Sequence, residues 1–376
     1  MTITLLNTRS DAERIRAIWH MLNSSQEVSY FLSVGWVENW LATLPEDVSV
    51  SLAVISQAET PVGAFFIGKS RVVRKRVFRS QAVFLNTTGM PEYDALCIEY
   101  NGIPLTDGHK CDLMDIIESL PIDWDEIFFP ALDSKAFPAN SLDTLRPPYV
   151  LVVDKVVPSP YVDLQSVREA KDGYISLLSA NTRQQIRRSY RRYQEKGPLN
   201  CRAAANAAEA HDMLAELIRL HQATWMARGK PGAFASAYFR KFHERLIETR
   251  FHTGEIQLLR ISFGNTVVGY LYNFIFRRRV LFYQSGLAYT TDPHCKPGLV
   301  CHVEAVRVNA EAGNLTYDFL GGESRYKLSL ATHQNRLIWV RIQKPRMKFK
   351  IERKLRAIKQ LLIAWRSSRK QNIYEQ

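Results

Sequence analysis

Two short segments in the second half of the chain combine turn-forming residues with side chains that can support chemistry. In the first, Lys296-Pro297-Gly298-Leu299 opens a predicted helix over residues 299–312, which follows a strand-like run over residues 280–288. Proline is favoured at the first helical position, and a helix N-terminus entered from a glycine turn presents free backbone N–H groups to an anion. Together with the charge of Lys296, this turn predicts a site for a phosphorylated donor such as coenzyme A. The alternative is an ordinary surface helix with a good start signal.

The second segment runs from Asp318 to Lys327 and contains two consecutive glycines. Asp318 lies inside an otherwise apolar strand, and a buried carboxylate must be paired or shift its pKa. We expect Glu323, Tyr326 and Lys327 to lie near it across the glycine turn. A phenol and an ammonium can donate to a leaving thiolate or to a developing oxyanion. Asp318 as base, Tyr326 as acid and Lys327 are therefore the candidate catalytic residues, and the alternative is a structural Asp318 paired with a neighbouring cation.

The positive charge of the chain is concentrated in two places. The net charge is +13, and residues 341–370 hold twelve Lys and Arg against one acid, while residues 183–196 hold six against one. The net charge of these two segments together is larger than that of the whole chain, so the remaining residues carry a small net negative charge. Local basic patches suit an anionic partner, such as a nucleotide, a nucleic acid, a phospholipid surface or an acidic polymer.

The first basic patch is a predicted helix over residues 182–195. Ile186, Tyr190 and Tyr193 fall on one face of this helix, and arginines fill the others. A solvated basic face is one interpretation. The other is a binding site for donor phosphates or an acidic acceptor, in which Arg187 and Tyr190 contact the substrate. The segment contains no signature of an RNA-binding module, so a nucleic-acid partner rests on charge alone.

The second basic patch is a predicted amphipathic helix over residues 346–376. Its apolar positions follow helical spacing and comprise Ile351, Leu355, Ile358, Leu362 and Trp365. Such a helix can lie on an anionic membrane surface, or it can pack its apolar stripe on the second domain.

Other kinds of site receive little support from the sequence. The five cysteines are scattered and show no CxxC spacing, and the histidines show no HExxH spacing, so no metal site is predicted. There is no GxSxG elbow and no Walker loop. His302, one turn into the helix after Pro297, is the histidine most worth testing. The sequence shows neither a signal peptide nor a transmembrane stretch, which predicts a cytoplasmic protein, peripheral at the inner face of the membrane if the C-terminal helix binds there.

The pattern of helices and strands predicts two α/β domains of the mixed α+β kind. Each half runs helix, helix, strands, helix, strand, and strands that follow one another are expected to pair mostly antiparallel, with helices on the faces. Prolines at 147, 148, 158 and 160 bracket a strand over residues 149–156 and mark the join. The predicted boundaries are 1–160, 161–345 and, for the basic helix, 346–376.

Taken together, these segments resemble the GNAT acyltransferase superfamily, in the branch of cellulose-biosynthesis-type acetyltransferases and Fem-type peptidyltransferases. The matching residues are Tyr30–Trp36 with Trp40, Glu99–Gly102, the basic helix from Thr182 to Gly197, His221 and Trp225 before Gly229, Gln284–Gly286, Lys296–Gly298 and Asp318–Lys327. The glycine-rich phosphate loop of simple GNAT enzymes is reduced here to Lys296-Pro297-Gly298.

The resemblance implies two tandem GNAT-like domains, of which only the second keeps a donor site. It implies that Lys296, Pro297, Gly298 and Leu299 contact the acyl-CoA pyrophosphate, that Gln284, Ser285 and Gly286 line the neighbouring strand, and that Asp318, Tyr326 and Lys327 line the acceptor side. Arg187, Tyr190, Trp225, His302 and Glu323 are the expected substrate-binding residues.

The implied activity is direct acyl transfer from acyl-CoA, with acetyl-CoA the expected donor, to an amine or hydroxyl. The acceptor is expected to be a small molecule or saccharide of envelope or exopolysaccharide pathways. Two alternatives stay open at this point. One is a Fem-type transferase that uses aminoacyl-tRNA, and the other is a non-catalytic module that binds a membrane surface or a partner.

Overall fold

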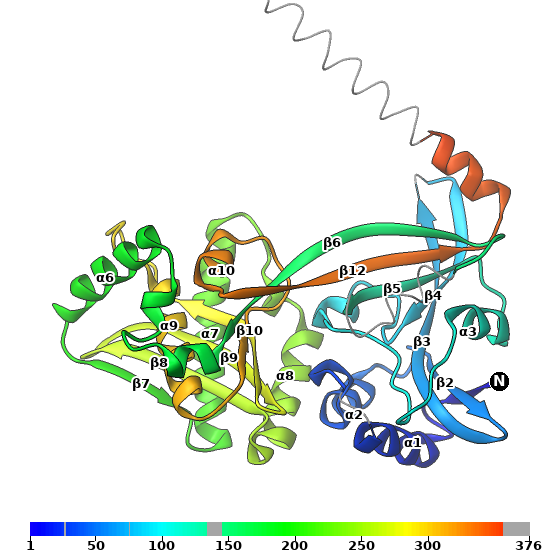
Figure 1. The fold of residues 1–376 in the computed structure, drawn as a ribbon, viewed down its shortest axis with the longest axis horizontal. Coiled ribbons are helices and arrows are strands. Elements are labelled where there is room, and N and C mark those ends of the chain that lie inside the picture. The colour runs from blue at the N-terminus through cyan, green and yellow to red at the C-terminus, as the bar shows by residue number, and fades with distance from the viewer. Residues whose placement is uncertain (26–27, 75, 134–144, 356–376) are drawn as a thin grey trace, which may run out of the picture.

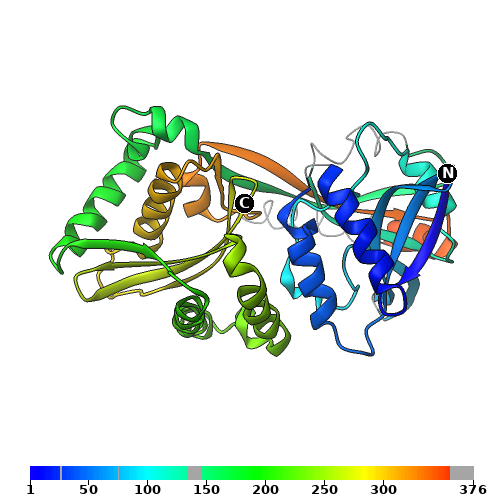
Figure 2. The ribbon, with the colours of Figure 1, turned by 90° about the horizontal axis from the view of Figure 1, so that it is seen from below.

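The computed structural model describes residues 1–25, 28–74, 76–133 and 145–355. Twelve strands of these residues form one sheet in the order β1-β2-β3-β4-β5-β12-β6-β11-β10-β9-β8-β7. Helices cover the sheet at two lobes (Figures 1 and 2). Most neighbouring strands run antiparallel, while β4 with β5 and β10 with β11 run parallel. This confirms the predicted mixed, mostly antiparallel sheet flanked by helices, and adds that the two halves share one continuous sheet.

The elements of the first half follow the apolar periodicity of the sequence. In α1, the buried residues Ile15, Ile18, Trp19 and Leu22 recur at helical spacing. The Ser33 side chain accepts a hydrogen bond from the Trp36 N–H and so begins α2. The bounds are β1 Thr2–Asn7, α1 Ala12–Ser25, α2 Val34–Thr43, β2 Val50–Gln57, β3 Thr60–Arg74, β4 Phe78–Leu85, α3 Leu113–Ser119 and β5 Glu126–Asp133.

The second half repeats this order with longer helices. Asn206 caps α7, and its buried residues Met213, Leu214 and Leu217 face the sheet. The bounds are β6 Val150–Asp163, α5 Leu164–Glu169, α6 Ala180–Gln194, β7 Leu199–Ala203, α7 Ala207–Ala227, α8 Ala237–Arg250, β8 Ile256–Phe263, β9 Thr266–Phe276, β10 Arg279–Leu287, α9 Pro297–Glu311, β11 Thr316–Asp318, α10 Arg325–Leu330 and β12 His333–Gln343.

Two long strands connect the lobes. In Figure 1, β6 and β12 run side by side from one lobe to the other. One end of β6 pairs with β11, while β12 pairs with β6 along its length and with β5 of the first half from Leu337 to Gln343. Pro158 and Pro160, expected at the join between domains, lie within β6 instead. Because the sheet passes through this point without a break, the boundaries at residues 160 and 345 stay predictions.

An aromatic core also joins the lobes. One cluster of buried residues combines α1, α2 and the turn at Tyr30–Leu32 with α7, α8 and β9. Within it, the ring of Tyr30 stacks on Phe274 at 4.6 Å and the ring of Trp36 meets Phe242 edge-on at 4.7 Å. Aromatic pairs of this kind add to the free energy of area burial. This shared core therefore holds the two lobes in a fixed relation to each other.

The C-terminal helix is described over residues 347–355 only. Phe349 and Glu352 are buried, and Glu352 pairs with Arg74 of β3 at 3.1 Å. This helix therefore packs on the first half, and the expectation that it packs on the second half is wrong. Ile351 and Leu355 of the predicted apolar stripe are 47% and 45% exposed, while Ile358, Leu362 and Trp365 lie outside the described residues. In the described part of the chain, no helix has the length and apolar character that crossing a bilayer requires.

Candidate active site

The helix α9 begins, as the sequence predicts, at Pro297. Lys296 precedes it without a side-chain cap, so the first N–H groups of α9 are not covered by a capping side chain. The backbone N–H of Lys296 donates to Ser189 Oγ of α6 at 2.9 Å, which fixes the turn. A Cβ placed on Gly298 would meet only Leu287 Cδ1, at 3.4 Å. The backbone at Gly298 is thus open to a ligand, and no described side chain fills this corner.

A gap between two parallel strands leads to this helix start. β10 and β11 pair only from Arg279 to Leu281, after which β11 ends and β10 continues to Leu287. On the other side β10 pairs with β9, with a bulge between Phe282 and Gln284. Bulges re-aim the backbone and are frequent next to active sites. Past Leu281 the backbone of β10 therefore has one edge that no described strand covers.

A cavity of about 590 Å³ lies at this gap. It is lined by the end of α7, by β10, by the turn before α9 and by the start of α10. The predicted residues that line it are Trp225, Gln284, Ser285, Lys296, Pro297, Gly298, Leu299, Tyr326 and Lys327. His221, Arg228 and Asp292 line it as well and were not predicted as site residues. The guanidinium of Arg228 lies 5.8 Å from the centre of the Trp225 ring, so this wall is both aromatic and cationic.

Lys327 and Tyr326 supply the donor groups of the cavity. Lys327 Nζ donates to the carbonyls of Leu320 at 3.2 Å and Gly321 at 3.0 Å. An ammonium has three donors, so one remains. Burial lowers the pKa of Lys327, while the nearby Glu99 and Asp318 oppose that shift. Burial raises the pKa of Tyr326, which keeps its phenol protonated at neutral pH.

Asp318 does not reach this cavity. Its side chain is 1% exposed and accepts hydrogen bonds from Tyr100 Oη at 2.5 Å, Ser159 Oγ at 3.2 Å and the Leu320 N–H at 2.8 Å. Arg279 lies 3.4 Å away as its ion-pair partner. Burial raises the pKa of Asp318, against these donors. With its oxygens already bonded, Asp318 ties β11 to β6 and to the first half, and its predicted role as base is not favoured by this geometry.

Gly286, predicted to bind the acyl-CoA donor, and His302, predicted to bind substrate, lie away from the cavity lining. A Cβ on Gly286 would come within 2.4 Å of the Leu217 carbonyl, so this glycine permits α7 to pack on β10. His302 is fully buried on α9, with Nδ1 3.1 Å from Tyr317 Oη and its ring stacked on Tyr326 at 5.4 Å. Burial lowers the pKa of His302 to about 3, so it is neutral.

Three further predicted residues are also outside the cavity. Tyr190 donates to Glu304 Oε1 at 2.5 Å and thereby joins α6 to α9. Arg187 is exposed on α6, where it lines a shallow groove beside Tyr190. Glu323 is exposed at the turn before α10. Their assignment to substrate binding stays a prediction.

Glu99 is a residue that the sequence did not reveal as part of this region. Its Oε2 accepts a hydrogen bond from the Gly321 N–H at 2.6 Å, on the turn that leads to Lys327. Burial raises the pKa of Glu99 to about 7, helped by the charge of Asp318, while the Gly321 N–H, Lys327 and Lys155 act in the opposite direction. The only sequence signal was the Glu99–Gly102 match to the family, because a contact across more than 200 positions leaves no local pattern.

The first half contains the matching strand gap in closed form. β4 and β5 pair in parallel only up to Phe84 and Phe128. Beyond that point Asn101 enters between them, with its N–H donating to the Ala131 carbonyl at 2.9 Å and its Nδ2 to the Leu85 carbonyl at 3.2 Å. The side chain of Asn86 holds Asn101 Oδ1 at 2.8 Å. The same loop thus closes the gap of the first half and delivers Glu99 and Tyr100 to the second.

Comparison with known proteins agrees with this geometry. Residues 180–328 match the family model described as an acetyltransferase (GNAT) domain, a range that includes the gap, the cavity and α9. The fold and the gap of this region are those of the class of domain that the family model describes. Residues 180–328, in the second half of the chain, are thus a GNAT domain. No curated protein matches the sequence.

Solved structures share the arrangement of the whole chain at low sequence identity. The crystal structure of FemX is 9% identical, with a TM-score of 0.54, and the match covers 90% of this chain and 97% of that one. The C-terminal domain of a putative lysylphosphatidylglycerol synthetase from Agrobacterium fabrum is 12% identical, with a TM-score of 0.50 over 88% of this chain and 92% of that one. At these identities the likeness establishes the two-lobed fold alone. In the residues that the structure describes, no group of His, Cys, Asp and Glu is arranged to hold a metal ion.

Proposed function

We propose that the protein is an acyltransferase that uses acyl-CoA, with acetyl-CoA the expected donor, and transfers the acyl group directly to an amine or hydroxyl. One observation carries the proposal: a single cavity joins the open N-terminus of α9, the uncovered edge of β10 and the side chains of Tyr326 and Lys327. These are an anion site, a backbone site for an extended chain and a pair of proton donors.

The residues present fit a donor with a diphosphate. The N–H groups at the start of α9 and the charge of Lys296 hold the phosphates. The edge of β10 near Gln284 and Ser285 binds the amide groups of the pantetheine arm, because backbone edges pair with extended chains. Lys327 directs its remaining N–H to the oxyanion as the acceptor attacks the thioester carbon, and Tyr326 protonates the thiolate as the C–S bond breaks.

The proposal is tested by thermal unfolding of the full chain with coenzyme A, acetyl-CoA and longer acyl-CoA thioesters. A ligand that binds the native state at 100 times its Kd stabilises it by about 2.7 kcal/mol, so the midpoint must rise. Lys296→Gln is expected to weaken binding about tenfold. Lys171→Gln, at an exposed lysine that does not line the cavity, is the matched control. No midpoint shift with any thioester would contradict acyl-CoA as donor.

A second candidate uses aminoacyl-tRNA as the donor, and one observation favours it. Arg187 and Arg191 are exposed on α6, and among the described residues no carboxylate pairs with either. Free arginines on one helix suit phosphates, and binding through them falls steeply with salt. Binding of tRNA that weakens with salt and is lost in the Arg187→Gln, Arg191→Gln double variant, together with no affinity for coenzyme A, would select this candidate.

A further inference from the structure

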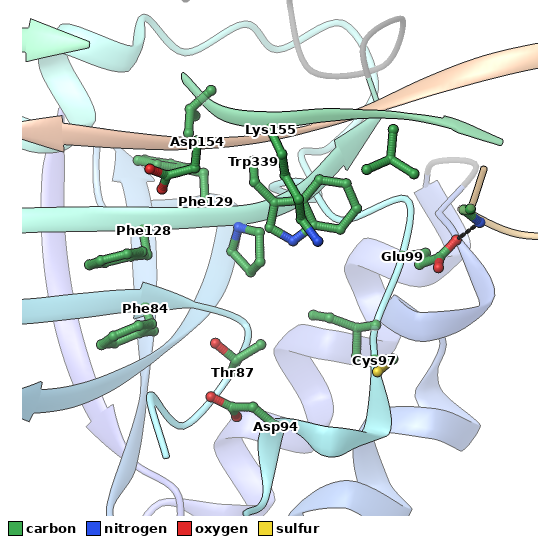
Figure 3. A pocket seen from close by; sticks show the side chains of 16 residues that line it. Phe84, Thr87, Asp94, Cys97, Glu99, Phe128, Phe129, Asp154, Lys155 and Trp339 are labelled. Atoms are coloured by element: carbon green, nitrogen blue, oxygen red, sulfur yellow. Dashed lines mark hydrogen bonds between the residues drawn. The ribbon is translucent and has the colours of Figure 1, made fainter. Parts of the chain in front are cut away.

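The first half holds a second cavity, of about 480 Å³, which the donor site does not use (Figure 3). It is lined by β4, β5, β6, β12 and the loop over residues 94–99, and it extends to Gly321 and Gly322. Aromatic rings form part of its wall: Phe84 stacks on Phe128 at 4.6 Å, and Trp339 also lines the cavity. The cavity therefore has room for the apolar part of a small molecule. It ends at the glycine turn of the active site.

Most polar side chains of this cavity already have partners. Asp94 accepts from the N–H groups of Thr88 at 2.7 Å and Gly89 at 2.8 Å, and both oxygens of Asp154 accept from Arg341 at 2.7 and 2.5 Å. Glu99 differs, because only its Oε2 is bonded, to the Gly321 N–H. Within the described ranges no hydrogen bond reaches Oε1. One carboxylate oxygen is thus available to a ligand in an otherwise apolar cavity.

Glu99 and Lys327 lie on the two sides of the glycine turn. A Cβ on Gly321 would stand 3.2 Å from Glu99 Oε1, and a Cβ on Gly322 would stand 3.3 Å from Lys327 Nζ. Glu99 lines the second cavity and Lys327 lines the donor cavity. The linings of the two cavities therefore come together along residues 321–327, where positions 321 and 322 carry no side chain.

We propose that the second cavity binds the acceptor, a primary amine carried on an apolar body, and that Glu99 takes its proton. This rests on the proposed acyl-CoA-dependent transfer. Glu99 removes one proton from the ammonium, and the freed nitrogen lone pair attacks the thioester carbon. The C–N bond forms and the C–S bond breaks, while the phenol of Tyr326 protonates the sulfur. The nitrogen then loses a second proton, which passes through water to the phenolate of Tyr326 and restores its phenol. Glu99 releases the first proton to solvent.

An amine on an apolar body fits the cavity better than a saccharide does. Beyond Glu99, only Thr87 and Cys97 of the lining carry a polar side chain that is not held by a hydrogen bond, a salt bridge or a ring contact in the described part of the chain. Hydroxyl groups of a sugar buried there would lose hydrogen bonds to water without replacement, which costs free energy. The ring of Trp339, a natural platform for a sugar, is covered by Lys155 Nζ at 3.8 Å from its centre.

The charged groups around Glu99 lead to two predictions of opposite sign for the affinity of an amine. Lys327, Lys155, Asp318 and Cys97 all face Glu99 at electrostatic range, and burial among them raises its pKa to about 7. A proton acceptor titrating near neutral pH is suited to an amine. Lys155 is exposed and positively charged, so it repels an incoming ammonium. Removing the charge of Glu99 should therefore weaken amine binding, and removing that of Lys155 should strengthen it.

The experiment is calorimetric titration of the full chain with three probes: 2-phenylethylamine, 2-phenylethanol of the same shape without the charge, and glucosamine. The amine is expected to bind at least tenfold more tightly than either of the others. In Glu99→Gln the preference for the amine over the alcohol should disappear, and in Lys155→Gln it should increase. Unfolding midpoints of both variants serve as the check on folding.

The outcomes separate this inference from the proposed function. Tighter binding of glucosamine, or equal binding of amine and alcohol by the native chain, overturns the inference without any variant. An unchanged preference in Glu99→Gln overturns the role of Glu99. A parallel titration with acetyl-CoA reports on the donor cavity alone, so a failure there, with amine binding intact, contradicts the proposed function and leaves the second cavity as an amine site.

Discussion

At the scale of single residues, the buried Asp318 and the half-buried Glu99, both near the glycine turn, differ in what they can do. Burial raises the pKa of both Asp318 and Glu99. Asp318 accepts from three donors of three different segments and has Arg279 as its ion-pair partner. Glu99 accepts from one backbone N–H. The first carboxylate is therefore a structural link between halves of the chain, and the second has capacity left for chemistry.

Replacing Asp318 by Asn tests this division. The variant leaves Arg279 without its partner, so the free energy of unfolding should fall by about 3 kcal/mol, while affinity for acetyl-CoA stays within twofold. Urea denaturation and calorimetry measure the two quantities. Asp107→Asn, at an exposed aspartate, is the control and should change neither. Full stability of Asp318→Asn combined with complete loss of turnover would restore Asp318 as the base.

The pH dependence of turnover tests Glu99. Its pKa of about 7 in the folded protein means that the carboxylate, the form that accepts a proton, predominates only above that value. The ratio kcat/KM should thus rise as the pH increases through about 7, once the ionisation of the amine itself is subtracted. In Glu99→Gln this step should be absent and the rate reduced by about 10²- to 10⁴-fold. A step that persists in the variant would assign it to another group.

At the scale of elements, the donor cavity depends on β10 extending beyond the end of β11. Three paired residues hold the two strands in register, and the uncovered part of β10 then lies beside the start of α9. In the first half the equivalent gap between β4 and β5 is closed by Asn101. The fold therefore offers the same opening twice, and in the first half Asn101 fills it.

Two glycines of this region give a matched pair of variants. Gly298→Ala meets little but Leu287, so stability should change by less than about 1 kcal/mol, whereas the added methyl lies where the donor approaches the backbone. Its affinity for acetyl-CoA should fall at least tenfold. Gly286→Ala meets the Leu217 carbonyl and should lower the free energy of unfolding by about 1–3 kcal/mol. If Gly298→Ala lowered the stability in thermal unfolding but kept its affinity for acetyl-CoA in titration, the donor would not approach the backbone at Gly298.

What the sequence could predict follows from the range of the interactions. The start of α9 at Pro297, the periodic helices α7 and α8 and the meander β8–β9–β10 depend on neighbouring residues, and all were predictable. Residues 94–99, by contrast, form a short turn and a loop with no repeating pattern of apolar residues. The contacts of Glu99 and Tyr100 with residues 318–321 join distant segments. No local periodicity encodes such contacts, which is why the site was only partly predictable.

At the scale of the whole molecule, two buried histidines link stability to pH. Burial lowers the pKa of His243 and of His302 to about 3 in the folded state, below the ordinary value of 6.5. At these two positions the unfolded chain therefore binds more protons. Their contribution to stability falls as the pH drops below about 6.5, by about 1.4 kcal/mol per pH unit for each histidine, while the raised pKa of Glu99 acts in the opposite direction below about pH 7.

Urea denaturation of the full chain between pH 8 and pH 5 measures this dependence. His243→Phe, in the aromatic core between the lobes, should reduce the slope by about 1.4 kcal/mol per pH unit. His109→Phe, at an exposed histidine of the first half, is the control and should leave the slope unchanged. A slope that is the same in His243→Phe would mean that this residue is not neutral in the folded protein.

The path of β12 bears on how the protein is made. This strand lies between β5 and β6, and its Val340 and Ile342 belong to the core of the first half. A ribosome releases β5 some 200 residues before it releases β12. During that interval the newly made N-terminal lobe carries an unpaired strand edge, a hazard for aggregation. Nascent chains stalled before residue 333 should be protease-sensitive throughout that lobe and should engage chaperones, whereas chains that include residue 343 beyond the exit tunnel should become resistant.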